Sequence, residues 1–411
     1  MDLPDLEMAG RSGAAVLRPR LSELIPLPEG SELFVLPDRA PVGIDPCDGL
    51  PSRVPEDPTA PGAPARAVAA FVAPAHTSLY TVAYEKLAAA VAPLPLFAYT
   101  AVGWLDGRFW VAAFRSDPDP RQDADRYRQR TVRAKTRQRL KKFPDNRLIQ
   151  HLGKCCLTYG CPAARNYFLD RWEAPVPTSP QCNAGCIGCI SLQTSGCCPS
   201  SQERIPFVPS PDEIVAMAVP HLIGAPRPIV SFGQGCEGEP LMQAKVIERA
   251  IKTIRKQTAR GTINLNTNAS MPGRVERLAR AGLDSIRVSL NSARPEKHRL
   301  YYRPRGFSLA EVTDSIRVMK RQNKFVSLNY FILPGFTDDP EEMSALFDLV
   351  ETFRPDLIQL RNLNMDPEWY METVQHRPTG AARGVLKWLG MLKREFPFLR
   401  FGYFNPYLGE E

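Results

Sequence analysis

The sequence lacks an uninterrupted hydrophobic stretch of the kind that crosses a membrane. One uncharged run, Leu87–Leu105, is long enough, but Pro93 and Pro95 divide it, and proline breaks a helix interior. We interpret this region as a helix near Thr81–Val91, a break, and a hairpin that turns at Asp106-Gly107. This pattern favours a soluble protein over a membrane protein.

The N-terminus also lacks the basic and apolar segments of a secretory signal, since Met1–Glu7 is acidic and no apolar run follows. We therefore expect a cytoplasmic protein with reduced thiols. In such a protein the ten cysteines favour metal binding over disulfides where they cluster.

No extreme of composition marks the chain. Its 52 Lys and Arg against 44 Asp and Glu give a charge of +8, and 44% of the 411 residues are hydrophobic. Wholesale disorder is thereby excluded. The charge favours anionic partners without identifying one, and the length predicts one large catalytic domain with an appendage.

Four segments differ in pattern. Residues 1–65 contain 12 prolines and predict an extended arm. Residues 66–150 predict a small α/β accessory domain that includes an apolar strand near Ala67–Val72. Residues 151–375 hold the main domain, and residues 376–411 a C-terminal helix and tail.

The main domain alternates short apolar strands with helical stretches, which implies parallel strands joined by right-handed crossovers. A first strand is expected just before residue 182, and helices are expected at about 241–258, 272–282, 308–322 and 340–353. The other five expected strands are Ile229–Phe232, Ile263–Asn266, Ile286–Leu290, Val326–Ile332 and Leu357–Arg361. Six units predict a partial (β/α)6 TIM-like barrel whose chemistry lies at the C-terminal strand ends.

The most informative motif is the CxxxCxxC formed by Cys182, Cys186 and Cys189, where the first strand should end. Zinc usually needs a fourth ligand, whereas a 4Fe–4S cluster held by three cysteines leaves one iron open. Spacing and position resemble those of the radical S-adenosylmethionine superfamily. The resemblance implies a 4Fe–4S cluster, S-adenosylmethionine and a 5′-deoxyadenosyl radical that abstracts hydrogen from a substrate.

Four further strand ends resemble the same family, so that the resemblance covers about 176–365. The sequence Glu237-Gly238-Glu239-Pro240 is similar to its Gly-Gly-Glu-Pro loop, and Ile332–Asp338, with Gly335, to its glycine turn under the adenine. The resemblance implies that Glu239 and nearby backbone hold the methionine ammonium, that Ser289 and Arg303 hold the carboxylate, and that Asn291 or Asn268 holds the ribose. The implied cofactor-binding residues are Gly238, Glu239, Asn268, Ser289, Asn291 and Arg303.

The sequence departs from the family at Gly188, where an aromatic residue usually precedes the third cysteine, so that Phe336 or Phe232 is expected to replace it. No cysteine follows Cys236, which disfavours a C-terminal extension with auxiliary clusters.

A second iron–sulfur cluster is one interpretation of the other cysteines, and buried thiols, zinc or a redox pair are the alternatives. The candidate ligands are Cys155, Cys156, Cys161, Cys197 and Cys198. Cys236 is either a packing residue or a thiol that acts on substrate. His151, His221 and His298 have no ligand-like spacing and predict surface or capping roles.

The segment Arg126–Lys142 contains nine basic residues and no acidic one, which predicts an exposed helix outside the barrel, positioned by residues 66–115. It either faces solvent or another domain, or it binds RNA or a nucleotide. A non-catalytic zinc or iron–sulfur module that contacts nucleic acid is the competing function. For the enzyme we expect a reductant such as flavodoxin or ferredoxin and a substrate that is anionic or RNA; its catalytic residues and substrate are not readable from the sequence.

Overall fold

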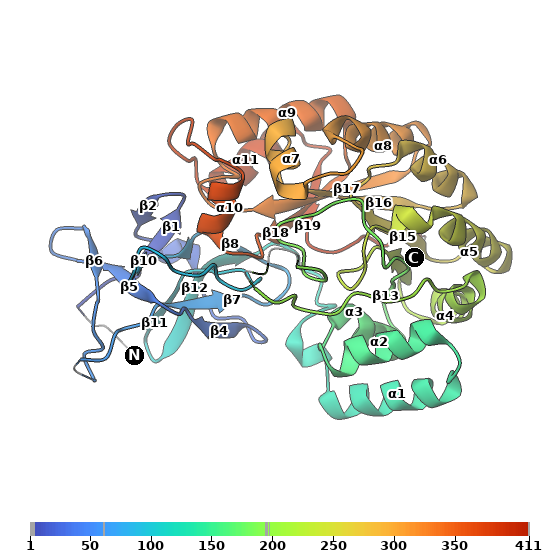
Figure 1. Cartoon of the computed structure of the whole chain (residues 1–411), viewed down its shortest axis with the longest axis horizontal. Coiled ribbons are helices and arrows are strands. Elements are labelled where there is room, and N and C mark those ends of the chain that lie inside the picture. The colour runs from blue at the N-terminus through green and yellow to red at the C-terminus, as the bar shows by residue number, and fades with distance from the viewer. Residues whose placement is uncertain (1–4, 61, 194–195, 197, 410–411) are drawn as a thin grey trace.

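A computed structural model describes residues 5–60, 62–193, 196 and 198–409 of the chain. It has two parts, a group of short antiparallel strands at the N-terminal end and a parallel sheet surrounded by helices (Figure 1). In these residues no helix is long and apolar enough to cross a membrane.

The parallel sheet follows the chain order from its first strand to its last, as in a barrel that does not close. Its strands are β13 (Glu173–Val176), β14 (Ile229–Phe232), β15 (Thr262–Thr267), β16 (Ser285–Leu290), β17 (Phe325–Ile332), β18 (Leu357–Asn362) and β19 (Arg400–Gly402). The six expected strands and the partial barrel are confirmed. The seventh, β19, pairs with β18 and was not predicted.

Helices surround this sheet (Figure 1). They are α4 (Pro211–Gly224), α5 (Ala244–Gln257), α6 (Pro272–Ala281), α7 (Pro295–Tyr302), α8 (Leu309–Arg321), α9 (Pro340–Phe353), α10 (Pro367–Thr373) and α11 (Val385–Glu395). The four expected helices are confirmed. Ser308 starts α8 with a capping box to Glu311, and Asp339 accepts the N–H of Glu341 at the start of α9.

Alternation along the strands separates the two faces of the sheet. Ile263 and Leu265 of β15 pack in the large hydrophobic core with the helices, so Asn264 and Asn266 face the barrel interior. There Asn405 donates to Glu173, Ser231 and Asn266. The interior of this barrel is therefore polar.

The N-terminal residues form strands rather than an extended arm. They are β1 (Gly10–Ser12), β2 (Ala15–Leu17), β3 (Leu24–Pro26), β4 (Glu32–Val35), β5 (Arg39–Ile44), β6 (Pro51–Arg53), β7 (Val68–Phe71), β8 (His76–Ser78), β9 (Thr81–Val82), β10 (Tyr84–Lys86), β11 (Val102–Leu105) and β12 (Arg108–Arg115). Residues 1–65 pair with residues 66–115, because β3 joins β12 and β4 joins β7.

The helix expected near Thr81–Val91 is wrong, because β9 and β10 occupy this segment and pair with β1 and β5. Tertiary pairing overrides the helix propensity of an Ala-rich segment here. The expected strand near Ala67–Val72 and the hairpin are confirmed. Asp106 and Gly107 both have positive φ, 51° and 75°, as a two-residue hairpin turn requires.

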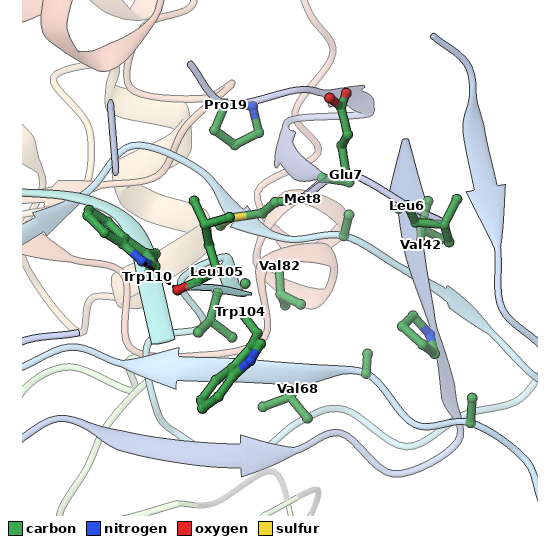
Figure 2. A pocket seen from close by; sticks show the side chains of 18 of the residues that line it. Leu6, Glu7, Met8, Pro19, Val42, Val68, Val82, Trp104, Leu105 and Trp110 are labelled. Carbon is green, nitrogen blue, oxygen red and sulfur yellow. Dashed lines mark hydrogen bonds between the residues drawn. The ribbon is translucent and has the colours of Figure 1, made fainter. Parts of the chain in front are cut away.

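A cavity of about 1320 Å³ lies among these N-terminal strands. Figure 2 shows Trp104, Trp110, Met8 and Val68 around it. All of its lining residues precede residue 111, so it lies outside the barrel.

The N-terminal strands pack on the barrel at the C-terminal ends of β17 and β18. Arg39, which is 1% exposed, pairs with Asp366 at 3.1 Å. Gly13 donates its N–H to Pro334 O at 2.9 Å, and a Cβ built on Gly335 would lie 1.9 Å from Gly13 N. The glycine turn thus carries a close contact between the two parts of the chain.

Three α-helices connect the two parts: α1 (Gln129–Lys142), α2 (Arg147–Leu157) and α3 (Pro162–Phe168). A short 3-10 helix, η2 (Ala124–Arg126), precedes them. The basic helix is confirmed as α1, and it lies outside the barrel (Figure 1). It packs on α2 and α3, where Val132 and Thr136 are buried. Its expected placement by residues 66–115 is therefore wrong, since α2 and α3 provide its apolar contacts.

Candidate functional site

The CxxxCxxC segment follows β13 and is held by backbone hydrogen bonds to the end of α7. Gly185 donates its N–H to Tyr302 O at 2.9 Å, and Ile187 donates to Tyr301 O at 3.1 Å. Arg305 donates its N–H to Asn183 O at 2.8 Å. The segment that carries the three cysteines is thereby fixed at the C-terminal edge of the sheet.

The three motif cysteines are partly buried thiols. Burial raises the pKa of Cys182 to about 11, and the charge of nearby Glu239 adds to this. Burial and the other two cysteines raise the pKa of Cys186 well above its usual value. Buried thiolates of like charge require a cation to stabilise them, so these three residues fit a metal cluster.

Arg204 supplies a positive charge beside the motif. Its Nη2 lies 3.5 Å from Cys189 Sγ, and its Nε donates to Ser191 Oγ at 3.2 Å. This contact could not be predicted from the sequence, because Arg204 lies 15 residues from Cys189 in an irregular segment.

The departure at Gly188 has a structural reason. A Cβ built on Gly188 would lie 2.9 Å from the Tyr301 hydroxyl and 3.2 Å from Met365 Sδ, so Tyr301 fills the space next to this position. Phe232 is buried in the large core, and Phe336 packs against Tyr370. Tyr301 was not predicted in this place.

The loop after β14 lies against the residues that precede the motif. Gly238 donates its N–H to Ser179 O at 2.6 Å, and Glu239 donates its N–H to Gln181 O at 2.8 Å. A Cβ built on Gly238 would lie 2.1 Å from Gln181 O. This close backbone approach requires glycine.

Glu239 connects this loop to the end of β15. Its carboxylate is buried and accepts the hydroxyl of Thr267 at 2.5 Å and the N–H groups of Asn268 and Leu241 at 2.8 and 2.9 Å. Burial raises its pKa to about 7. A carboxylate offers about four acceptor positions, so one remains for a ligand.

Asn268 extends this connection to the cysteine motif. Its Nδ2 donates to Asn183 Oδ1 at 2.9 Å, and Asn183 in turn donates to Ser270 Oγ. The Cys182–Cys189 segment and the ends of β14 and β15 are thus joined by one chain of hydrogen bonds.

Glu237, which stands in place of a family glycine, has a clear structural task. Its carboxylate accepts the N–H groups of Thr178 at 2.7 Å, Ser179 at 2.9 Å and Gln234 at 2.7 Å. Burial raises its pKa to about 7. It holds the loop after β14 against the end of β13, a role that the sequence did not reveal.

The residues at the end of β16 differ in their surroundings. Asn291 is fully buried; its Nδ2 donates to Tyr370 Oη and Lys297 O, while its Oδ1 has no partner in the described residues. Ser289 is partly exposed and shares the inner face of β16. Arg303 ends α7 with φ 45°, and its Cβ would lie 3.7 Å from a Cβ built on Gly185.

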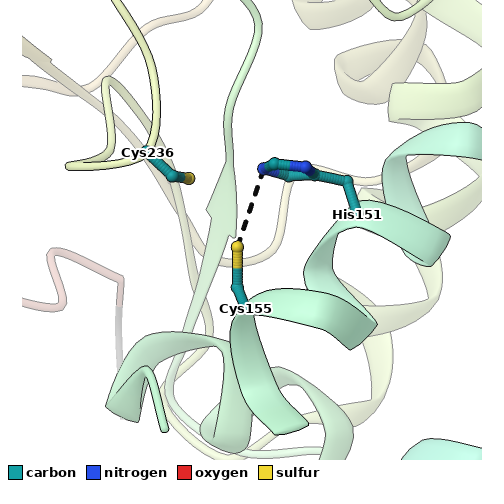
Figure 3. Close-up of side chains that lie close together, drawn as sticks. All are labelled: His151, Cys155 and Cys236. Atoms are coloured by element: carbon teal, nitrogen blue, oxygen red, sulfur yellow. Dashed lines mark hydrogen bonds between the residues drawn. The ribbon is translucent and has the colours of Figure 1, made fainter. Parts of the chain in front are cut away.

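The other candidate cysteines lie in different surroundings. Cys155 lies beside His151 and Cys236, as Figure 3 shows, and Cys161 precedes α3. Cys156 contacts Thr136 Oγ1 at 3.4 Å, and Cys198 belongs to a separate hydrophobic cluster. Cys197 lies outside the described residues. The second-cluster hypothesis stays a prediction.

The thiols of Cys155 and Cys236 affect each other's pKa. A hydrogen bond from Cys236 and the neighbouring His151 lower the pKa of Cys155, whereas the same hydrogen bond and burial raise the pKa of Cys236. His151 lies in this cluster rather than in the expected surface or capping role.

Two arginines on the inner face of the sheet were not predicted. Arg287 of β16 and Arg361 of β18 both approach Gln359 Oε1 at 3.3 Å, and the Nε of each is buried without a partner in the described residues. Burial and the charge of Arg361 lower the pKa of Arg287 to about 9. The charge of Glu173 acts in the opposite direction on the pKa of Arg287.

The arrangement matches a known family. Residues 176–347 match the family model of the Radical SAM superfamily, which supports the resemblance found in the sequence. The family implies a 4Fe–4S cluster and S-adenosylmethionine as cofactors, and it favours the enzyme over the non-catalytic module.

Two curated relatives are named GTP 3′,8-cyclase. The protein of Aquifex aeolicus (strain VF5) is 31% identical over 164 residues, 39% of this chain and 48% of that protein. The protein of Limosilactobacillus fermentum is 24% identical over 212 residues, 48% of this chain and 57% of that protein. The chain thus spans about half the length of these relatives.

Similar solved structures include methylornithine synthase, with 15% identity, a TM-score of 0.38 and coverage of 59% of this chain and 68% of that chain. Another is Streptococcus suis SuiB bound to S-adenosylmethionine, with 14% identity, a TM-score of 0.40 and coverage of 67% of this chain and 66% of that chain.

Proposed function

We propose that the protein is a radical S-adenosylmethionine enzyme in which Cys182, Cys186 and Cys189 hold a 4Fe–4S cluster. The observation that carries this proposal is the chain of hydrogen bonds from Asn183 through Asn268 to Glu239. It keeps the cysteine motif, the Gly-Glu-Pro loop and the end of β15 at one edge of the barrel. Parallel α/β barrels carry their chemistry at this edge.

S-adenosylmethionine would bind between these elements. Glu239 offers its remaining acceptor position to the ammonium, while Gly238 keeps the loop close to the motif. Ser289 and Arg303 would hold the carboxylate, since a guanidinium binds carboxylates in two-point geometry. The Oδ1 of Asn291, which is buried without a partner among the described residues, would accept a ribose hydroxyl; Asn268 is the alternative residue for the ribose.

Together the bound cluster and S-adenosylmethionine supply a 5′-deoxyadenosyl radical that removes hydrogen from the substrate. The chain contributes placement and exclusion of water. We expect a one-electron donor of the flavodoxin or ferredoxin type and a cytoplasmic location, where thiols stay reduced.

We further propose that the substrate carries an anionic group bound by Arg287 and Arg361. Two guanidiniums face the same interior, and only one carboxylate, Glu173, acts on Arg287. Each guanidinium has a buried Nε for which the described part of the chain offers no partner. A phosphate or carboxylate would neutralise the excess charge and accept these donors. The names of the curated relatives make a nucleotide the first anion to test.

Anaerobic reconstitution tests the enzyme proposal. We expect about four irons per motif and release of 5′-deoxyadenosine under a reductant, both lost when the three motif cysteines become alanine. A colourless protein that contains no iron and binds no S-adenosylmethionine would contradict the proposal.

Nucleotide binding tests the substrate class separately. Arg287→Gln and Arg361→Gln should each weaken binding of a nucleoside triphosphate about tenfold or more, as expected for loss of a charge-assisted contact. The exposed Arg249→Gln on α5 is the control. Equal affinity in all three variants would argue against an anion site in the barrel, while leaving the cofactor assignment intact.

A further inference from the structure

A second group of side chains that can bind a metal lies between α2 and the loop after β14. His151 and Cys155 come from α2, and Cys236 comes from the loop after β14 (Figure 3). One ligand atom from each residue lies within 4.8 Å of the other two. Among the described residues, no other group of three histidine, cysteine or acidic side chains brings its ligand atoms this close together.

Helical spacing explains two of the three ligands. His151 and Cys155 are four residues apart on α2, so their side chains share one face of the helix. The third ligand, Cys236, reaches the same point from the barrel. A site of this kind requires the tertiary fold and therefore could not be predicted from the sequence.

The distances fit one small tetrahedral ion. His151 Nε2 lies 3.6 Å from Cys155 Sγ. With Zn–S bonds of about 2.3 Å and Zn–N bonds of about 2.0–2.1 Å, a tetrahedral angle places sulfur and nitrogen about 3.6 Å apart and two sulfurs about 3.8 Å apart. The cysteines of an iron–sulfur cluster bind different irons, so such compact spacing favours a single ion.

The surroundings also suit a bound metal. Cys155 and Cys236 are 3% and 6% exposed, which would keep a metal–thiolate bond dry. His151 is partly buried, and its ring contacts Phe207 edge-on. Two thiolates and one imidazole are soft and borderline ligands of the kind that zinc prefers.

We propose that His151, Cys155 and Cys236 bind a zinc ion distinct from the Cys182–Cys189 cluster. Cys161 lies outside the three-atom group, so these three residues are the protein ligands of the proposed ion. Cys236 stands three residues before Glu239, and the ion fastens the Gly-Glu-Pro loop to α2. The site would thus stabilise the loop that faces the cofactor.

Metal analysis of the full-length protein, purified anaerobically and titrated with zinc, tests the proposal. We expect about one zinc per chain in the unmodified protein and in the Cys182/Cys186/Cys189→Ala variant. Cys155→Ser and Cys236→Ser should each lower zinc affinity by a factor of about 100 or more, and His151→Ala by about 10 or more. Cys156→Ser is the matched control, because this neighbour on α2 faces Thr136 instead.

X-ray absorption at the zinc edge gives a readout that does not depend on how the variants fold. The unmodified protein should show two sulfur ligands at about 2.3 Å and nitrogen or oxygen ligands at about 2.0–2.1 Å. Absence of sulfur ligands, or zinc retained by the Cys155/Cys236→Ser double variant, would overturn the proposal. So would a Cys155–Cys236 disulfide without metal, or about four irons retained in the Cys182/Cys186/Cys189→Ala variant, which would support the second-cluster hypothesis. Since none of these outcomes depends on radical chemistry, the proposed function is tested separately.

Discussion

Gly238→Ala is a direct test of how the cofactor loop is held. The glycine does not have a positive φ, so alanine brings no backbone strain of its own. Its methyl group, however, would lie 2.1 Å from Gln181 O and 2.5 Å from Gln181 C. Both are backbone atoms and cannot rotate away as a side chain could, so the loop must move away from the segment that precedes Cys182.

This movement breaks two backbone hydrogen bonds, from Gly238 N to Ser179 O and from Glu239 N to Gln181 O. Each such bond contributes about 1 kcal/mol, and overpacking in a rigid site costs about 1–3 kcal/mol. We therefore expect Gly238→Ala to lower the free energy of unfolding by about 3–5 kcal/mol.

The assay is thermal unfolding of the metal-free chain together with iron content after reconstitution. A loss of this size in a barrel domain corresponds to a decrease of about 6 °C or more in Tm, and we expect iron to fall with it. Gly273→Ala is the control, since a Cβ at this helical position meets nothing within 4 Å and should stabilise α6 slightly. If both variants retain the Tm and iron content of the unmodified protein, the close approach is not a constraint.

Three further predictions follow from individual contacts. Arg204→Met should lower the reduction potential of the cluster, measured by electron paramagnetic resonance titration, because it removes a cation 3.5 Å from Cys189 Sγ; Arg204→Lys should keep most of it. Burial lowers the pKa of His298 from 6.5 to about 4, so the folded state binds fewer protons than the unfolded state and loses stability as the pH falls from about 6.5 to about 4. His298→Phe should flatten this part of the plot of unfolding free energy against pH, and an unchanged plot would exclude His298 as the cause. Neutralising four exposed residues of α1 should weaken binding of a polyanionic substrate in a salt-dependent way but leave cofactor cleavage intact, and binding that is indifferent to salt and substitution would make α1 structural. The four residues are Arg130, Arg133, Arg137 and Lys141.

The barrel could be predicted from the sequence because its signals are local. Five of the six predicted strands are short apolar runs, and helix-start residues such as Ser308 and Asp339 lie between them; this repeat defines the topology. The N-terminal strands gave no such signal, because they are short and pair over long separations. Glu32 pairs with Phe71, and Gly10 pairs with Val82, so that partners rather than propensity determine the strands.

In the candidate site, too, features with local sequence signals could be predicted and features made by distant residues could not. The cysteine motif and the Gly-Glu-Pro loop are contiguous in sequence and could be recognised there. Arg204, Tyr301 and Arg287 could not, since each acquires its role from a neighbour that lies far away in the chain. Tyr301 fills the space at Gly188, more than 100 residues earlier, and no local pattern encodes this contact.

The contacts of the four residues Cys236–Glu239 predict that this loop tolerates little change. Cys236 faces α2, Glu237 accepts three N–H groups from Thr178, Ser179 and its own loop, Gly238 touches Gln181, and Glu239 reaches the end of β15. Consecutive residues therefore connect the loop to three parts of the chain, namely α2, the segment after β13 and the end of β15. A displacement at one connection must strain the others, because packed interiors are not continuously deformable. It follows that loss of a metal at Cys236 would reach Glu239 through three residues whose own contacts are fixed, and would change cofactor affinity without a change in any cofactor contact.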